Sequence, residues 1–227
     1  AHYFPNGTIN YAQNLLKKRD DGLAIVFRGE DKVEAKLSWA QLYDTVSSMA
    51  QALRAAGVKK GSRICAMMPN MPETIIGYLA EASIGAIWSS ASPDFGKQGI
   101  LDRFGQIEPQ IMIACAAYHY NGKTHDCLEK LGDVAKEISS LEKIVIVPYA
   151  SPSPDLSVLP KAVLWDEFVE SHTPQDIEFE QMNFNDPLVI MFSSGTTGVP
   201  KCIVHGHGGT LIQHVKEFHL QCDVKPG

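Results

Sequence analysis

The sequence predicts an α/β fold built on a parallel, doubly wound, layered sheet. Short apolar runs typical of buried strands recur along the chain, and amphipathic helical stretches separate most of them. This repeated strand–helix–strand order favours parallel pairing, right-handed crossovers and helices on both faces of the sheet. In such sheets, ligands gather beyond the carboxyl ends of the strands.

The first elements are a strand pair and a long helix. Residues 23–28 and 33–37 should pair around a turn at 29–31. A helix should follow Ser38, which forms a capping box with Gln41, and should stop at Gly57. Its apolar face, which we expect in the core, comprises Trp39, Leu42, Tyr43, Val46, Met49, Ala50 and Leu53.

The alternation of strands and helices then continues. The second helix should begin at about Met71, with Asn70 as its cap, and run to Gly85. Its predicted apolar face is Ile75, Ile76, Leu79 and Ala82. The remaining expected elements are strands at 63–68, 86–89, 110–114, 143–147 and 188–192, and helices at 97–107, 124–139 and 165–169.

A loop rich in glycine and hydroxyl groups follows the last of these strands. It reads Ser193-Ser194-Gly195-Thr196-Thr197-Gly198-Val199-Pro200-Lys201, and the apolar pair Ile203-Val204 follows, so we expect two buried strands to hold it. The glycines allow backbone N–H groups to turn toward an anion, the hydroxyls can donate, and Lys201 adds a cation. The loop therefore predicts polyphosphate binding, although its spacing is not that of a Walker loop. The simpler interpretation of such a cluster is a solvated turn.

These residues resemble the phosphate loop of the AMP-forming acyl-CoA synthetases, a family of adenylate-forming enzymes. Within the family, the chain is most similar to the acetyl-CoA and acetoacetyl-CoA synthetase branch, and Phe192 and segment 208–216 favour the acetoacetyl-CoA members. Cys202 departs from the pattern, because most of the superfamily has glycine there. The other matching segments are 3–7, 10–15, 68–73, 90–96, 120–123 and 205–209.

The resemblance implies a two-step reaction that uses ATP, Mg²⁺ and coenzyme A. Acetoacetate would attack the α-phosphate to give an acyl-adenylate and pyrophosphate, and the coenzyme A thiol would then displace AMP. Lys201 would stabilise the pyrophosphate, and segments 90–96 and 120–123 are candidate coenzyme A contacts. The residues expected to contact the phosphates are Ser193, Ser194, Gly195, Thr196, Thr197, Gly198 and Lys201.

The resemblance also implies a domain organisation. Residues 1–20 correspond to the amino-terminal segment, and residues 21–227 to an incomplete AMP-binding domain with an exposed connector near 148–182, where Ser, Pro and Asp are frequent. In the family, the acyl and adenine pockets, an acidic metal-associated residue, the hinge and the adenylation lysine lie further along. We therefore expect an amino-terminal fragment that is inactive without the remaining carboxy-terminal part of the synthetase. Alternatives are an acetyl- or propionyl-CoA synthetase fragment, a non-catalytic nucleotide-binding module and a structural interaction protein.

Composition agrees with a piece of a soluble enzyme, for which we expect a cytosolic location, and the resemblance implies that its partners are small-molecule substrates. A net charge of −6 with only short basic clusters argues against coating of nucleic acid, and no apolar run approaches the ~20 residues that span a bilayer. The five cysteines are odd in number and lack Cys-x-x-Cys spacing, which argues against a disulfide framework or a zinc site. We expect Cys65 and Cys115 to be core thiols, and His205 and His207 to cap or pack rather than bind a metal.

Overall fold

The computed structural model describes residues 4–30, 32–193 and 198–225. These residues form a seven-stranded sheet that is parallel except for its last pair. In spatial order its strands are β10 (Ala162–Leu164), β9 (Lys143–Val147), β6 (Ile111–Cys115), β4 (Arg63–Met67), β5 (Ile87–Ala91), β12 (Pro187–Phe192) and β13 (Cys202–Gly206).

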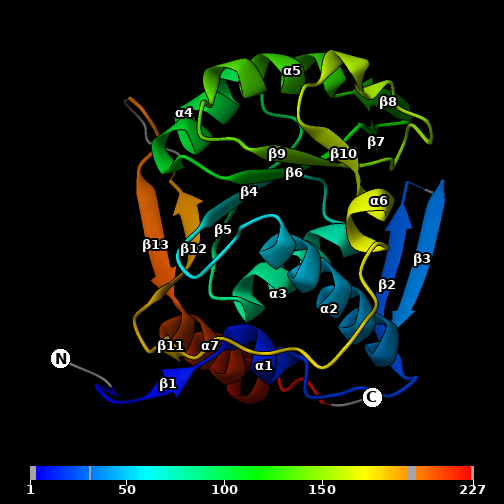
Figure 1. The fold of residues 1–227 in the computed structure, drawn as a ribbon. Helices are drawn as coiled ribbons and strands as arrows, with labels where there is room; N and C mark the ends of the chain where they lie inside the picture. The colour runs from blue at the N-terminus through cyan, green and yellow to red at the C-terminus, as the bar shows by residue number, and fades with distance from the viewer. Residues whose placement is uncertain (1–3, 31, 194–197, 226–227) are drawn as a thin grey trace.

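Helices cover both faces of this sheet, which confirms the predicted doubly wound architecture. The longest, α2 (Trp39–Ala55), packs with α3 (Pro72–Ser83) on one face, whereas α4 (Lys97–Ile107) and α5 (Leu128–Glu137) lie on the other (Figure 1). The shorter helices are α1 (Tyr11–Leu15), α6 (Trp165–Val169) and α7 (His207–Lys216). A 3-10 turn at Leu156–Val158 lies before β10, and a π-helical turn at Glu217–Gln221 follows α7. In the described parts of the chain, no helix is long and apolar enough to span a bilayer.

Three small antiparallel pairs flank the main sheet. They are β1 (Thr8–Ile9) with β11 (Met182–Asn183), β2 (Leu23–Gly29) with β3 (Val33–Ser38), and β7 (Ala117–Tyr120) with β8 (Lys123–Asp126). The hydrophobic core lies on both sides of the central strands, and all five residues of β6 are buried. A strand buried on both faces reads as a continuous apolar run, which is why the sequence located it.

The capping box predicted at α2 is confirmed. The Ser38 hydroxyl accepts from the Gln41 backbone N–H at 3.2 Å, and the Gln41 side chain accepts from the Ser38 N–H at 2.9 Å. The predicted apolar face is buried except for Trp39, which is half-buried beside Lys18. Two polar side chains of α2 also hold the chain segment that crosses it, because the Ser48 hydroxyl donates to the His172 carbonyl and the Tyr43 hydroxyl accepts from the Ile177 N–H.

The start of α3 differs from the expectation. Met71, not Asn70, is its N-cap, and no side chain caps the helix, whose first residue is Pro72. Proline lacks an N–H and has its φ preset, so the first turn needs fewer capping bonds. Ile75 is 38% exposed and does not belong to the buried face, because it lies at the opening of a pocket described below.

The helix expected at 124–139 begins only at Leu128. Residues 123–126 instead form β8, which pairs with β7. Asn121 and Gly122 both have positive φ, and two consecutive residues of this kind form the tight turn that closes such a hairpin. The sequence analysis overlooked this Asn-Gly signal and assigned most of the strand β8 to the helix that follows it.

The expected connector near 148–182 is only partly exposed. It contributes β10 at the edge of the sheet and α6, where the predicted helix at 165–169 is confirmed. Trp165 and Leu159 are buried within it. The division of the chain into domains stays a prediction, since the sheet and its core run through the whole described chain.

Two adjacent glycines of α7 test how tightly this helix packs. A Cβ on Gly208 would overlap the ring of Phe184, so Gly208→Ala should lower the free energy of unfolding by about 1–3 kcal/mol. Gly209 is a matched control with no heavy atom within 4 Å, and Gly209→Ala should be neutral or stabilising by up to about 1 kcal/mol. Urea denaturation measures both; equal midpoints for the two variants would contradict the close approach of α7 to Phe184.

Candidate functional site

The predicted phosphate loop leaves the sheet from the carboxyl end of β12. This strand lies between β5, with which it is parallel, and β13, with which it is antiparallel. The Ser89 hydroxyl of β5 donates to the Ile190 carbonyl of β12 at 2.8 Å in the core. A buried bond of this kind fixes the strand from which the loop starts, so the loop emerges at the edge where such sheets bind ligands.

The base of the loop is a β-hairpin. Phe192 pairs with Cys202, and the Ser193 N–H donates to the Lys201 carbonyl at 3.1 Å. Gly198 has φ of +91°, a conformation that residues with a Cβ rarely adopt. The predicted phosphate contacts Ser194, Gly195, Thr196 and Thr197 lie outside the described residues, so the structure places Ser193, Gly198 and Lys201 of the predicted set.

Lys201 is exposed at the exit of the loop. Among residues 4–30, 32–193 and 198–225, no side chain or carbonyl forms a hydrogen bond or ion pair with its ammonium group. The role expected for Lys201, which is stabilisation of pyrophosphate, stays a prediction.

Gln106 of α4 braces the same exit and was missed by the sequence analysis. Its amide donates to the Pro200 carbonyl at 2.9 Å, and its side-chain oxygen accepts from the Cys202 thiol at 3.7 Å. The sequence predicted the helix that carries Gln106 but gave no signal that one residue of α4 contacts a loop 94 positions away. Only the tertiary structure brings them together.

We expected the strand after the loop to be buried, but its apolar side chains are exposed. Ile203 is 44% exposed and Val204 is 56% exposed, because β13 is the last strand of the sheet formed by the described residues. It is antiparallel to β12, since a short loop reverses the chain and leaves no room for a crossover. The apolar pair Ile203-Val204 was correctly assigned to a strand. Apolar character alone could not show that no described element covers these two side chains.

His207 packs in the junction between β13 and α7, as predicted. It is fully buried, and its Nδ1 accepts from the Tyr11 N–H at 3.3 Å, while its Nε2 has no partner among the described residues. Burial lowers the pKa of this imidazole to about 4. The described parts of the chain contain no group of three His, Cys, Asp or Glu side chains arranged to hold a metal ion. His207 therefore serves as a neutral acceptor that joins α7 to α1.

Each of the two candidate coenzyme A segments is held by a carboxylate. The Tyr118 hydroxyl at the start of β7 donates to Asp94 Oδ1 at 2.6 Å, and this bond, together with that from Ser92, lowers the pKa of the Asp94 carboxyl. At the other end of the hairpin, Glu30 accepts from the backbone N–H groups of Gly122 and Asn121, which lower its pKa. These carboxylates order both segments, while their contact with coenzyme A stays a prediction.

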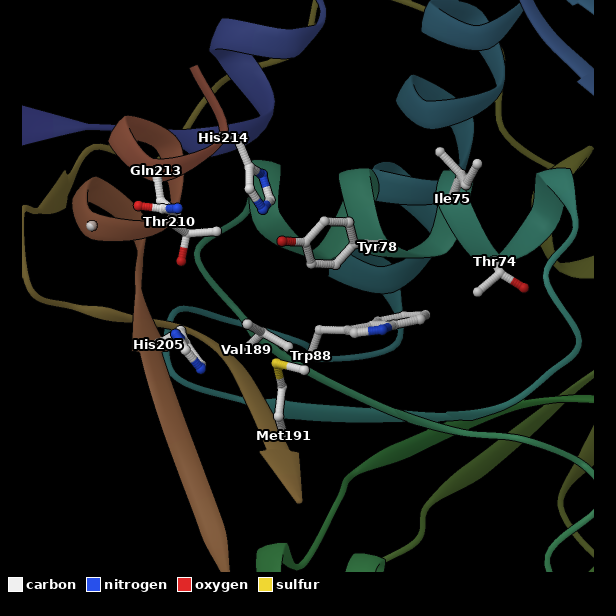
Figure 2. Close-up of a pocket in the computed structure, with 11 residues that line it drawn as sticks. Thr74, Ile75, Tyr78, Trp88, Val189, Met191, His205, Thr210, Gln213 and His214 are labelled. Carbon is white, nitrogen blue, oxygen red and sulfur yellow. The ribbon is translucent and has the colours of Figure 1, made fainter. Parts of the chain in front are cut away.

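A pocket of about 440 Å³ lies beside β12 and β13. Val189 and Met191 of β12 and His205 of β13 form one wall, and α3 and α7 enclose it from the other sides (Figure 2). On its helical side, the Tyr11 hydroxyl lies 2.9 Å from Nδ1 of His214. The remaining lining residues are Thr74, Ile75, Tyr78, Trp88, Gly209, Thr210 and Gln213.

Comparison with known proteins decides the family. The model of the AMP-binding enzyme family matches residues 13–225, which is nearly the whole chain and includes the β12–β13 hairpin. The chain belongs to the AMP-binding enzyme family.

Individual relatives agree with this assignment. The chain is 52% identical to an acetoacetyl-coenzyme A synthetase of Rhizobium meliloti (strain 1021), covering 100% of the chain and 35% of that relative. It is 48% identical to the acetoacetyl-CoA synthetase of Macaca fascicularis, covering 96% of the chain and 34% of that relative. The solved acetoacetyl-CoA synthetase from Streptomyces lividans superposes with a TM-score of 0.92 at 36% identity, covering all of this chain and 34% of that one. The chain thus spans about a third of the length of these relatives.

The buried imidazole predicts how stability depends on pH. In the unfolded chain a histidine binds a proton below its ordinary pKa of 6.5, whereas folded His207 remains neutral down to about pH 4. Between these values the unfolded state holds the extra proton, so His207 makes the free energy of unfolding fall with falling pH, by up to about 3 kcal/mol.

His207→Gln keeps a hydrogen-bond acceptor for Tyr11 but does not titrate. Chemical denaturation at a series of pH values should therefore show a shallower loss of stability in the variant than in the parent chain. Parallel curves for the two proteins between pH 6.5 and pH 4 would show that His207 does not carry this dependence.

Proposed function

We propose that this chain supplies the phosphate-binding part of a longer ligase that activates acetoacetate with ATP and transfers the acyl group to coenzyme A. The observation that carries the proposal is the hairpin that bears Ser193, Gly198 and Lys201 at the carboxyl end of β12, in a chain of the AMP-binding enzyme family. The choice of acetoacetate is supported by the 52% identity to a relative named for that acid.

The chain's own groups would act on the phosphates. In the first step a carboxylate oxygen of the acid attacks the α-phosphorus of ATP, and the bond to the bridging oxygen breaks toward pyrophosphate. Negative charge grows on the departing oxygens, and the Lys201 ammonium would stabilise it. The hydroxyl of Ser193, at the start of the loop, would add a donor. Catalysis of this kind depends on position and charge rather than on a protein nucleophile.

Mg²⁺ would be held mainly by the phosphates of the nucleotide. The described residues offer no cluster of three metal-binding side chains, and oxygen ligands from phosphates are ones that Mg²⁺ prefers. Coenzyme A would approach the edge formed by segments 90–96 and 120–123, which Asp94 and Glu30 hold in place. Its thiol would attack the acyl carbon and release AMP.

The identity of the acid is the finer part of the proposal. A malonamoyl-CoA synthetase of Penicillium aethiopicum is also similar, at 35% identity, so relatives of this chain act on more than one short acid. Acetate and propionate are the alternative substrates, and AMP release measured with each of the three acids distinguishes them. We further propose a cytosolic location, which fractionation of the source cells tests.

Replacing Lys201 tests the role of the hairpin. In the full-length polypeptide, Lys201→Ala should lower kcat/KM for ATP by about 100- to 1000-fold, because the growing charge on pyrophosphate loses its partner. Lys36→Ala, which removes an exposed lysine on β3, is the matched control and should leave activity unchanged. Acetoacetate-dependent AMP release measures both; unaltered kinetics of Lys201→Ala in a correctly folded protein would refute the assignment.

The 227-residue chain by itself should be inactive. The proposal places the groups that select the acid and assist adenylate formation in the remaining carboxy-terminal part of the synthetase. Acetoacetate-dependent exchange of labelled pyrophosphate into ATP should therefore be seen with the full-length polypeptide only. Exchange catalysed by the isolated chain would show that it contains a complete adenylation site.

A further inference from the structure

The backbone on either side of Lys201 is held by hydrogen bonds from two different parts of the fold. The Pro200 carbonyl, which shares a peptide plane with the Lys201 N–H, accepts from the Gln106 amide at 2.9 Å. The Lys201 carbonyl, in the next peptide plane, accepts from the Ser193 N–H at 3.1 Å. Because peptide units are planar, these bonds orient both units that meet at the Lys201 Cα. They thereby set the direction in which the lysine side chain leaves the hairpin.

The Gln106 amide forms hydrogen bonds on both of its sides. Its nitrogen donates to the Asp102 carbonyl, one turn earlier in α4, as well as to the Pro200 carbonyl. Its oxygen accepts from the Cys202 thiol at 3.7 Å. A primary amide has two N–H donors and one oxygen, so both N–H groups and the oxygen have partners here. The bond to Asp102 fixes the amide against its own helix, and the other two bonds hold the residues before and after Lys201.

The helix that carries Gln106 is itself fixed. Its side chains Ile100, Phe104 and Ile107 are buried in the hydrophobic core. At the start of the helix, the Lys97 ammonium forms an ion pair with Glu137 of α5 at 2.7 Å. Figure 1 shows α4 beside the start of β13. A contact made from a packed helix restrains the hairpin, whereas a contact from a mobile segment would move with it.

The Lys201 side chain depends on restraint of this kind. In the part of the chain that the structure describes, its ammonium group forms no hydrogen bond or ion pair that could hold it in place. The stem of a lysine is flexible, so the backbone from which it starts determines the region that its ammonium can reach. A displacement of about 1 Å can lower the rate of a reaction that depends on position.

We propose that Gln106 is a positioning residue for Lys201 in the step that releases pyrophosphate. This inference rests on the proposed function, which assigns Lys201 to the departing pyrophosphate. Gln106 holds the backbone around Lys201, so that the ammonium lies where the negative charge of pyrophosphate grows. The later transfer of the acyl group to coenzyme A does not use this charge. Gln106 should therefore affect formation of the adenylate and not the transfer step.

A purely structural role for Gln106 predicts a different result. The Gln106 side chain is exposed on α4, and alanine is the best helix former, so Gln106→Ala should not lower the urea midpoint of the full-length polypeptide. A residue that only stabilises the fold would affect the midpoint, or both chemical steps equally. A change in one chemical step at unchanged stability therefore identifies a positioning role.

The two half-reactions provide the first test. In the full-length polypeptide, Gln106→Ala should lower kcat for acetoacetate-dependent exchange of pyrophosphate into ATP by about 3- to 10-fold, as expected for loss of a hydrogen bond between neutral groups. The transfer of the acyl group from a supplied acyl-adenylate to coenzyme A should be unchanged. Gln98→Ala is the matched control, because Gln98 is an exposed glutamine of α4 that donates to the Asp102 side chain at 2.6 Å. It should leave both steps unchanged.

A double-mutant cycle shows whether Gln106 acts through Lys201. If it does, adding Gln106→Ala to Lys201→Ala should change the exchange rate by less than about 2-fold, because residues that act through each other are not additive. Effects that multiply, or unaltered exchange in Gln106→Ala, would overturn the positioning role. So would equal losses in the two half-reactions, since these indicate damage to the fold.

Binding of pyrophosphate keeps the two proposals apart. A full-length polypeptide without acetoacetate-dependent AMP release would refute the proposed function, and the cycle is then measured on the dissociation constant for magnesium pyrophosphate. Gln106→Ala should raise this constant about 3- to 10-fold in the parent protein and leave it unchanged in Lys201→Ala. An unchanged constant in the parent background, or no binding to the parent protein, would overturn the positioning role. An active ligase in which Gln106→Ala has no effect would refute the positioning role alone.

Discussion

The parallel pairing of β12 with β5 is the constraint on which the candidate site depends. The central strands are buried on both faces, so their backbone groups must be satisfied by the ladder itself. β12 joins that ladder beside Trp88 and is fixed further by the bond from Ser89 to the Ile190 carbonyl. A loop that begins at Ser193 therefore starts from a strand that is paired with a neighbour on each side.

The β12–β13 hairpin is held on two sides by Gln106 and His207. Gln106 binds its exit from the face that carries α4, and His207 ties its far end to α1 through the Tyr11 N–H. The two contacts differ in their desolvation cost. Gln106 is exposed and exchanges hydrogen bonds with water for hydrogen bonds with the hairpin. His207 is buried, and burial disfavours its charged form, which accounts for its low pKa. The orientation of the β12–β13 hairpin is thus coupled to helices far away in the sequence.

The charges near the candidate site differ from what the net charge of the chain suggests. The chain has a net charge of −6, yet Lys201 is exposed at the candidate site, while the Asp94 and Glu30 carboxylates accept hydrogen bonds from hydroxyl and backbone donors. A carboxylate that accepts two or more hydrogen bonds repels an approaching phosphate less than a free one, because its donors offset part of its charge. Hydrogen bonding therefore offsets part of the negative charge of these two carboxylates.

Local patterns in the sequence determined the α/β class, the extents of α4 and α6, the capping box of α2 and the two strands that flank the predicted phosphate loop. Apolar period and helix caps act over a few residues, so they can be read locally. They did not reveal the β7–β8 hairpin, because the helical pattern after its Asn-Gly turn was read as extending across β8. Nor did they show that α3 has no side-chain cap. Tertiary structure alone decided that β13 is the last strand in the sheet of the described residues, that Gln106 contacts Pro200 and that His207 is neutral. Each of these depends on groups brought together from distant positions, and an apolar residue such as Val204 has the same local pattern whether or not another element covers it.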